Sequence, residues 1–251
     1  MRKIYIVPNI VTTANMFCGF YSVILSIQGE YVSASWAILA AAVFDMLDGR
    51  IARLAKATSQ FGVEYDSLSD LISFGMAPGV LAFQWALAPY GRLGWLASFL
   101  YLACAALRLA RFNCNTATMP KGFFQGLPSP AAAGVMATLV IFQHATAWPA
   151  DALDAQFAKR HVALVLALTI ASLMVSTIRF PSFKELNWKS RTTFGYLMIG
   201  VMAMVLIAVK PEVTLFLTLT GYVALSMVWN IFRVFRSPVA TNSAAKTHSA
   251  E

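Results

Sequence analysis

Long apolar runs recur along nearly the whole of this sequence, and they constrain its fold more than any other feature. A helix needs roughly 20 apolar residues to cross the hydrocarbon core of a bilayer, because unpaired backbone polar groups cannot face lipid. The chain is 59% hydrophobic and only 12% charged, which is typical of integral membrane proteins. The sequence therefore predicts an all-α, polytopic membrane helix bundle. Eight candidate spans fit, at residues 10–28, 32–57, 62–88, 93–113, 128–148, 161–178, 193–209 and 213–233.

The distribution of Lys and Arg predicts how this bundle is oriented. Positive residues are retained on the cytoplasmic side of short loops. If the N-terminus is cytoplasmic, fifteen of the nineteen Lys and Arg residues lie at cytoplasmic ends and loops. We therefore expect both termini to be cytoplasmic, with residues 1–236 as one membrane-embedded domain and residues 237–251 as a disordered tail.

The net charge of +8 does not indicate a nucleic-acid partner. A groove for nucleic acid needs clustered Lys and Arg with exposed stacking aromatics, and the aromatics here lie in the apolar spans. The topology of a membrane protein accounts for most of the charge. The remainder fits contact with anionic lipid headgroups.

Four aspartates interrupt the second and third expected spans. Residues three or four apart share one face of a helix, so Asp45 and Asp48 line one stripe, while Asp66 and Asp70 line another. A short turn joins the two spans as an antiparallel pair, which lets the stripes face each other at similar depth. Several like charges at low dielectric require bound cations or protonation of some of the acids.

Carboxylates without Cys or His favour a hard divalent ion such as Mg²⁺ or Mn²⁺. Two such ions could bridge the acids and clamp a pyrophosphate during a phosphoryl displacement. Small residues at Gly49, Ala52 and Gly62 would let a flat ligand approach the helices. The predicted metal ligands are Asp45, Asp48, Asp66 and Asp70.

Two other interpretations of the aspartates stay open at this point. They could join helices by pairing with Arg50, Arg53 or backbone groups, although one or two polar residues would be enough for that. They could also mark the path of a divalent-cation transporter. A transporter would spread its acids along a route through the bilayer and carry related polar segments in a second half, and no second acidic segment occurs here.

The same stretch resembles the signature of the CDP-alcohol phosphotransferase family, D-x2-D-G-x2-A-R-x8-G-x3-D-x3-D. The match holds at every specified position: Asp45, Asp48, Gly49, Ala52, Arg53, Gly62, Asp66 and Asp70. The resemblance implies a membrane enzyme with a six-helix catalytic core that moves a phosphatidyl-type group from a CDP-linked lipid to an alcohol and releases CMP. It also implies that Asp45, Asp48 and Asp66 hold the divalent ions and that Asp70 completes the cluster as the general base.

The resemblance further implies a nucleotide site beside the acids. It assigns Gly49, Ala52, Arg53 and Gly62 to the cytidine nucleotide. The alternative for Arg53 is a snorkelling side chain that only sets topology. On the first span a polar stripe either contacts the nucleotide or seals a polar seam between helices; it consists of Asn9, Thr12 and Asn15.

Three further stretches resemble the bacterial phosphatidylserine synthase branch of that family. They read PNIVTTANMFCGF from residue 8, LRLARFN from residue 107 and FQGLPSPAA from residue 124. This resemblance implies CDP-diacylglycerol as donor, L-serine as acceptor and a bacterial inner membrane with the site facing the cytoplasm. The alternatives are glycerol 3-phosphate, inositol or inositol phosphate as acceptor, or an ether-lipid donor.

Candidate acceptor-binding residues follow from these stretches. Arg108 and Arg111 are three apart at the cytoplasmic mouth of the fourth span, where forked guanidinium groups could bind the serine carboxylate or the lipid phosphate. The alternative is that both arginines only set topology. Asn113, Lys121 and Gln125 could line the same site from the following loop.

The third span also contains a close-packing motif. Gly75 and Gly79 form a G-x-x-x-G, which permits two helices to approach closely. Since the family resemblance suggests a homodimer, this motif is a candidate for part of the dimer interface. Pro78 between the two glycines predicts a kink.

Overall fold

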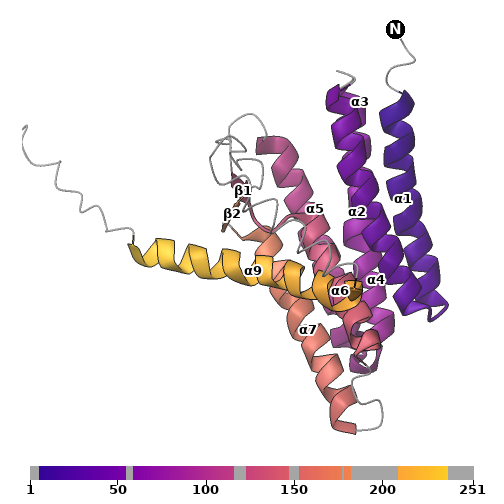
Figure 1. The fold of residues 1–251 in the computed structure, drawn as a ribbon, viewed down its shortest axis with the longest axis vertical. Coiled ribbons are helices and arrows are strands. Elements are labelled where there is room, and N and C mark those ends of the chain that lie inside the picture. The colour runs from indigo at the N-terminus through magenta and orange to yellow at the C-terminus, as the bar shows by residue number, and fades with distance from the viewer. Residues whose placement is uncertain are drawn as a thin grey trace, which may run out of the picture.

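The computed structural model describes residues 6–54, 59–115, 123–146, 153–176, 178–181 and 209–236. In these ranges the chain is a bundle of long helices, as Figure 1 shows, so the predicted all-α fold class is confirmed. The helices are α1 Ile6–Ile27, α2 Tyr31–Leu54, α3 Gln60–Asp70, α4 Ala77–Ala82, α5 Arg92–Asn115, α6 Ser129–Ala145, α7 Leu153–Val175 and α9 Pro211–Arg236. Short π-helical and 3-10 turns connect α3 with α4 and extend α4 to Tyr90.

Among the described residues, five helical stretches are long and apolar enough to cross a membrane. They are Pro8–Ile27, Tyr31–Leu54, Gln60–Tyr90, Arg92–Cys114 and Pro211–Asn230. These stretches correspond to the first four expected spans and the eighth. Large apolar side chains such as Phe17, Phe20 and Phe99 are exposed on their outer faces, where a bilayer would cover them.

The remaining expected spans differ from the structure in length or lie elsewhere. The fifth is α6, which has 17 residues. The sixth is α7, which begins at Leu153 rather than 161, because the polar and charged residues within 153–160 lower the hydropathy of its first two turns. The expected span at 193–209 and the tail at 237–251 lie outside the described residues, Val209 excepted.

Two three-residue strands, which the hydropathy pattern did not predict, join loops at one end of the bundle. β1 (Phe123–Gln125) pairs antiparallel with β2 (Arg179–Pro181), with Phe124 opposite Phe180. Just after β1, Gly126 has a φ of 80°, a conformation that favours glycine. The main-chain N–H of Gly126 donates to the carbonyl of Ile178, which continues the link between the two loops.

Helix α6 forms the buried centre of the bundle. It contacts α2, α4, α7 and α9 as well as the turn that follows α3. Ala132, Ala133 and Ala137 are fully buried on it, and such small side chains let the neighbouring helices come close. α9 packs on α6 and runs across the other helices in Figure 1, and few of its residues are fully buried.

The kink predicted at Pro78 takes the form of a π-helical turn, Leu71–Met76, immediately before α4. Proline has no N–H, so Pro78 cannot donate to the carbonyl of Phe74 four residues earlier. The buried hydroxyl of Tyr101 on α5 donates to that carbonyl instead, at 3.2 Å. α5 therefore supplies a side-chain donor to a carbonyl that Pro78 leaves without its usual α-helical donor.

Replacing Tyr101 with phenylalanine is expected to lower the free energy of unfolding by about 1 kcal/mol, because the Phe74 carbonyl loses a buried donor. The melting temperature in detergent should fall by about 2–4 °C for a chain of this size. Tyr90→Phe is the matched control, since the buried Tyr90 hydroxyl has no hydrogen-bond partner among the described residues. Equal losses in the two variants would contradict the proposed role of Tyr101.

The G-x-x-x-G motif packs inside the chain. A Cβ atom on Gly75 would lie 3.0 Å from Leu102 Cδ1, and one on Gly79 would lie 3.2 Å from the main-chain oxygen of Ser98. Both contacts are with α5 of the same chain. The expectation that Gly75 and Gly79 belong to a dimer interface is therefore wrong, because α5 already occupies that face.

Candidate active site

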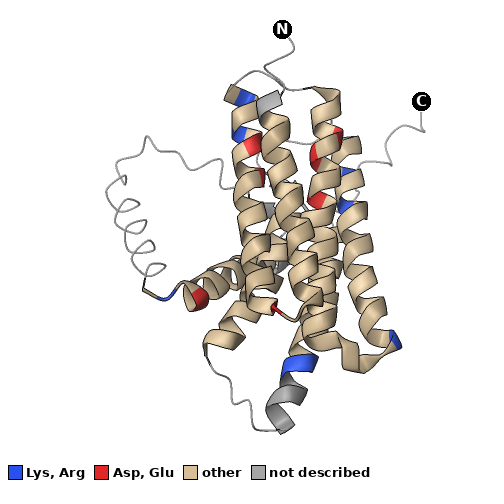
Figure 2. Cartoon of the chain, turned by 90° about the vertical axis from the view of Figure 1, so that its right-hand side faces the viewer, with Lys and Arg blue, Asp and Glu red and all other residues tan. Residues whose placement is uncertain are grey.

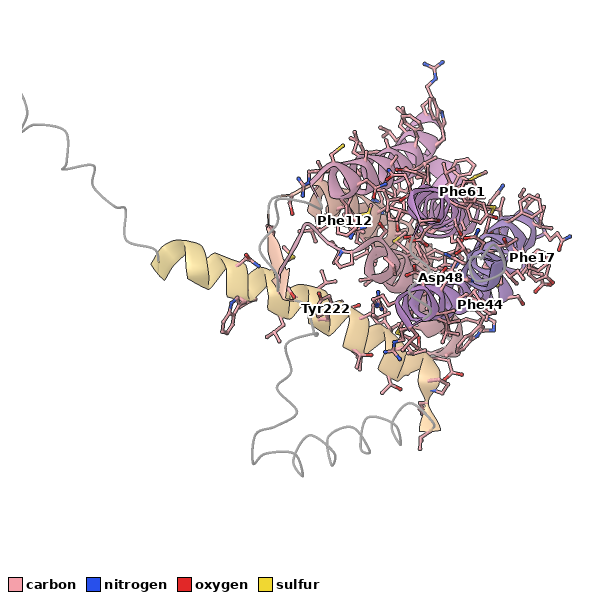
Figure 3. The ribbon with its side chains drawn as sticks, turned by 90° about the horizontal axis from the view of Figure 1, so that it is seen from above. Phe17, Phe44, Asp48, Phe61, Phe112 and Tyr222 are labelled. Atoms are coloured by element: carbon pink, nitrogen blue, oxygen red, sulfur yellow. The ribbon has the colours of Figure 1, made fainter. Side chains whose placement is uncertain are left out.

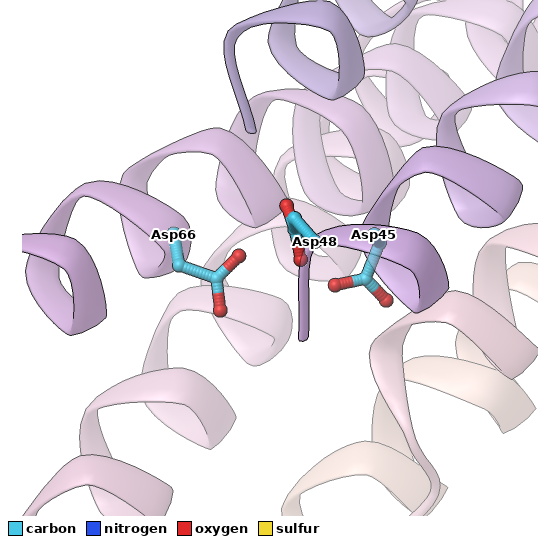
Figure 4. Close-up of side chains that lie close together, drawn as sticks. All are labelled: Asp45, Asp48 and Asp66. Carbon is cyan, nitrogen blue, oxygen red and sulfur yellow. The ribbon is translucent and has the colours of Figure 1, made fainter. Parts of the chain in front are cut away.

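Three aspartates converge where α2 lies beside α3. Asp45 and Asp48 come from α2 and Asp66 from α3, and each offers a carboxylate oxygen within 4.8 Å of the others. Figure 4 shows the three side chains, with Asp48 between Asp45 and Asp66. Asp48 is only 4% exposed, and seen from above (Figure 3) it lies between the helices, whereas Phe17 lies at the outer surface. The spacing of the acids predicts this convergence for all four aspartates, and the structure brings these three together.

The electrostatics of the three carboxylates favour a bound cation. At 4.8 Å and an effective dielectric constant of about 20, two ionised carboxylates repel each other by about 3 kcal/mol. Asp66 Oδ1 is buried and has no hydrogen-bond partner among the described residues. An oxygen-only donor set with an unpartnered carboxylate oxygen fits a hard divalent cation. These three residues could therefore hold a divalent metal ion.

Asp70 is close to this group but outside it. It lies one helical turn beyond Asp66 and is not among the carboxylates that converge within 4.8 Å. Its Oδ1 accepts a hydrogen bond from Asn15 Nδ2 at 3.2 Å. Its charge still interacts with those of Asp45, Asp66 and Asp48. The structure thus separates three converging acids from a fourth with a different neighbour.

A pocket with a volume of about 180 Å³ opens beside the aspartates. Its walls come from the beginning of α1, the end of α2 and the beginning of α3. Every residue predicted to bind the nucleotide lines it: Asn9, Thr12, Gly49, Ala52, Arg53 and Gly62. Asp48 and Asp66 also line it, so the pocket and the acid cluster share a wall.

Glycines keep the pocket wall open. A Cβ atom on Gly49 would have the Arg53 guanidinium, at 3.5 Å, as its nearest contact, and one on Gly62 would lie 3.9 Å from Asn9 Oδ1. At the start of α3, the Ser59 side chain accepts the N–H of Gly62 and caps the helix. Larger side chains at Gly49 or Gly62 would take up part of the space that a ligand needs.

The polar stripe on α1 contacts both aspartate-bearing helices. Thr12 Oγ1 lies 3.0 Å from Asp48 Oδ2 and 3.1 Å from the main-chain oxygen of Pro8, so its proton serves one acceptor or is shared. Asn9 and Thr12 line the pocket, whereas Asn15 is fully buried in the seam between helices. Asn15 therefore belongs to a polar seam between helices, whereas contact of Asn9 and Thr12 with a nucleotide stays a prediction.

Two buried serines on the third span were missed by the sequence reasoning. Ser69 Oγ donates to the main-chain oxygen of Thr12 at 3.0 Å, and Ser73 Oγ donates to that of Asn15 at 2.9 Å. Their spacing of four in an apolar helix was the available signal, because it places two hydroxyls on the face that a neighbouring helix covers. They attach α1 to the helix that carries Asp66 and Asp70.

The structure gives the two predicted acceptor-site arginines different partners. Arg108 is buried, donates from Nη1 to Ser129 Oγ at the start of α6, and lies close enough to Asp70 and Asp45 for their charges to interact. Arg111 donates to the main-chain oxygens of Val175 and Ser176, both at 3.0 Å, and so caps the end of α7. Arg108 thus lies near the aspartates, whereas the contacts described for Arg111 are with the end of α7.

The remaining predicted acceptor residues have other positions. Asn113 Nδ2 donates to Ser67 Oγ at 2.9 Å and thereby connects α5 with α3. The main chain of Gln125 is part of β1, opposite Arg179. Lys121 lies outside the described residues. Ser129, which the sequence did not single out, joins the group through its hydrogen bond with Arg108.

Charge is distributed unevenly along the bundle. In Figure 2 most Asp and Glu residues lie toward the end where α1 begins, whereas Lys and Arg residues lie toward both ends. The acids that converge come from neighbouring helices rather than from a path along the whole bundle. Such a local cluster favours a single reaction site over an ion route.

A family model described as CDP-alcohol phosphatidyltransferase matches residues 5–235. The chain belongs to the CDP-alcohol phosphatidyltransferase family. The resemblance inferred from the aspartate signature is therefore confirmed. Because the chain belongs to this family, we no longer retain the alternative interpretation of the aspartates as the path of a divalent-cation transporter.

Several curated proteins are similar to the chain. A Helicobacter pylori (strain ATCC 700392 / 26695) protein is 37% identical over 188 residues, which cover 75% of this chain and 77% of that protein. A Bacillus subtilis (strain 168) protein is 31% identical over 180 residues, covering 71% of this chain and 92% of that protein. A Saccharomyces cerevisiae protein is 37% identical over 150 residues, covering 52% and 51%. Each of the three is named CDP-diacylglycerol-serine O-phosphatidyltransferase.

Proposed function

We propose that this protein transfers the phosphatidyl group of CDP-diacylglycerol to the hydroxyl of L-serine and releases CMP. The observation that carries the proposal is the convergence of Asp45, Asp48 and Asp66 beside a pocket, with Asp70 one turn beyond. The family and the names of its similar members support the same reaction and the acceptor. We include in the proposal a homodimer in a bacterial inner membrane, with the site open to the cytoplasm.

Asp45, Asp48 and Asp66 would hold Mg²⁺ or Mn²⁺, and two ions per site are expected. When bound, the metal supplies positive charge that stabilises the pyrophosphate oxygens and the departing CMP. The protein itself holds the three carboxylate groups close together in fixed orientations. Thr12 donates to Asp48 and thereby limits the rotation of the central carboxylate of the three.

The pocket beside the acids binds the cytidine nucleotide in this proposal. Its small residues let the nucleotide lie against α2 and α3, and Arg53 lines the wall as the positive side chain. A guanidinium matches phosphate oxygens in geometry and charge. The acyl chains of the donor stay in the bilayer, where the outer faces of the helices are apolar.

Asp70 acts as the general base. It takes the proton of the serine hydroxyl, the serine oxygen forms a bond to the lipid-side phosphorus, and the bond from that phosphorus to the CMP oxygen breaks. Its position beyond the three converging acids places it on the side away from the pocket, next to Arg108. Arg108 binds the serine carboxylate and so orients the hydroxyl toward Asp70.

Arg108→Gln is expected to raise the KM for serine by about 10- to 100-fold, the effect of losing a charge-assisted hydrogen bond. The KM for CDP-diacylglycerol should change little, because the nucleotide pocket lies on α1, α2 and α3. Arg111→Gln is the matched control: it removes the cap of α7 and should lower the melting temperature without changing the KM for serine. Steady-state kinetics with each substrate varied measures both constants. An unchanged KM for serine in Arg108→Gln would contradict the role.

The function is tested by an acceptor panel. Purified protein in detergent receives CDP-diacylglycerol with Mn²⁺ or Mg²⁺ and, in separate reactions, L-serine, glycerol 3-phosphate, inositol or inositol phosphate. We expect CMP release and phosphatidylserine only with serine. Transfer to glycerol 3-phosphate or inositol phosphate without transfer to serine would refute the acceptor. An ether-linked CDP lipid in parallel reactions tests the donor.

A further inference from the structure

Asn15 is a polar residue at the centre of the bundle to which the reaction described so far assigns no task. It lies on α1 and has no exposed surface. Its side-chain amide Nδ2 donates to Asp70 Oδ1 at 3.2 Å. An uncharged amide in an apolar span is costly to bury unless it makes such a bond. The bond therefore points to a role for Asn15 at Asp70.

The backbone on both sides of this hydrogen bond is held in place. Ser73, three residues after Asp70, donates to the main-chain oxygen of Asn15 itself, and Ser69 donates to that of Thr12. One turn further along α1, a Cβ atom on Gly19 would lie 2.6 Å from Ser73 Cα, so the two helices are as close there as glycine allows. The amide of Asn15 therefore approaches Asp70 from a fixed position.

A fixed donor at one oxygen determines where the other oxygen points. A free carboxylate rotates about its terminal bond with little preference. With Oδ1 held by Asn15, Oδ2 is the oxygen left to receive a proton. Arg108 lies near the same carboxylate and, as a cation, attracts it without selecting one of its oxygens. Since Asn15 is neutral, it orients Asp70 without adding a charge to the crowded acids.

We propose that Asn15 is a positioning residue of the transfer reaction, which holds Asp70 Oδ1 so that Oδ2 faces the hydroxyl of the acceptor. The inference rests on the proposed function of Asp70 as general base. The proton passes from the acceptor hydroxyl to Oδ2, the acceptor oxygen bonds to phosphorus, and the CMP oxygen leaves with the electrons of the broken bond. Asn15 changes no bond and touches no reacting atom.

The first experiment separates kcat from KM in Asn15→Leu and Asn15→Ala. We expect kcat for serine to fall by about 10- to 100-fold, because misplacing a catalytic group by about 1 Å has an effect of that order. The KM for CDP-diacylglycerol and the affinity for Mn²⁺ should stay at their wild-type values, because Asn15 lies outside both the pocket and the three converging acids. Asn15→Ala removes the same amide without adding bulk or charge, so it serves if Asn15→Leu does not fold.

Two variants control for a purely structural role. Ser73→Ala removes the hydrogen bond to the main chain of Asn15 without touching Asp70. Ser22→Ala changes another buried polar side chain of α1, whose hydroxyl has no partner among the described residues. We expect Ser73→Ala to lower the melting temperature and to reduce kcat by less than Asn15→Leu does, because the close approach at Gly19 still holds the two helices together, and Ser22→Ala to change neither. A loss of kcat in Ser73→Ala equal to that in Asn15→Leu would overturn the proposal.

The second experiment combines Asn15→Leu with Asp70→Asn. If Asn15 acts through Asp70, the double variant should keep the residual rate of Asp70→Asn, because no base remains to be oriented. A further loss equal to that of Asn15→Leu alone would overturn the proposal, as would an unchanged kcat in Asn15→Leu. Absence of serine-dependent CMP release from the wild type would instead overturn the proposed function, so the two failures are distinguishable.

Discussion

Asp48→Asn is expected to abolish both Mn²⁺ binding and phosphatidyl transfer. Asp48 lies between Asp45 and Asp66 and also lines the pocket. Its carboxylate therefore belongs both to the three proposed metal ligands and to the wall of the proposed nucleotide pocket. A metal ion contributes several kcal/mol of charge stabilisation to such a reaction. A loss of about 4 kcal/mol corresponds to a rate about 10³-fold lower. We therefore expect at least this decrease in kcat.

Thermal unfolding gives a readout of the same change that does not depend on activity. In the wild type, Mn²⁺ at about 100 times its dissociation constant should stabilise the folded state by about 2.7 kcal/mol. Asp48→Asn should lose this gain. Without metal, the variant should be at least as stable as the wild type, because one of three mutually repelling carboxylates is gone while the amide oxygen can still accept from Thr12.

Glu64→Gln is the matched control for this experiment. Glu64 is an exposed acid on α3, two residues from Asp66 and outside the group of three. It should retain both the Mn²⁺-dependent stabilisation and the transfer activity. A stabilisation by Mn²⁺ that survives in Asp48→Asn would contradict the assignment of the metal ligands.

Asp70→Asn is expected to lower kcat by about 10²- to 10⁴-fold, the usual contribution of a general base. Stabilisation by Mn²⁺ should be retained, because Asp70 is not one of the three converging carboxylates. The amide can still accept a hydrogen bond from Asn15, so the fold around it should be preserved. Kinetics together with melting curves in the presence and absence of Mn²⁺ measure both effects.

The comparison of Asp48→Asn with Asp70→Asn also decides between two versions of the site. The sequence predicted four carboxylate ligands, whereas the structure brings three together. If Asp70→Asn loses the Mn²⁺-dependent stabilisation along with activity, Asp70 is a ligand as well as a base. If only kcat falls, the division of the four acids into three ligands and one base is supported.

Much of the fold was predictable because it follows from local periodicity. The apolar runs predicted the helices that contain the five membrane-length stretches, and the three- and four-residue spacing of the acids placed two of them on each of two facing helices. Hydropathy was less informative where polar residues continue a helix, as in the first turns of α7. It also gave no indication that α9 runs across the bundle, since an apolar helix can pack in several directions.

The arginines show where local periodicity stops being informative. Arg108 and Arg111 share a helix face by spacing, and both were predicted to bind the acceptor. Three residues along a helix, however, are separated by about 4.5 Å along the axis and about 60° around it. That shift is enough for Arg108 to reach Ser129 on α6 while Arg111 reaches the end of α7. The sequence alone does not indicate which helix end lies opposite each arginine.

The sequence by itself determined the membrane class, the family and the identity of the acid cluster, because each depends on residue types at fixed separations along one or two helices. Only the tertiary structure decided that Gly75 and Gly79 face α5, that Asp70 has Asn15 as its neighbour, and that Arg108 faces the acids. These outcomes depend on contacts between helices far apart in the chain. Such contacts are set by the packing of whole helix faces, which no local spacing specifies.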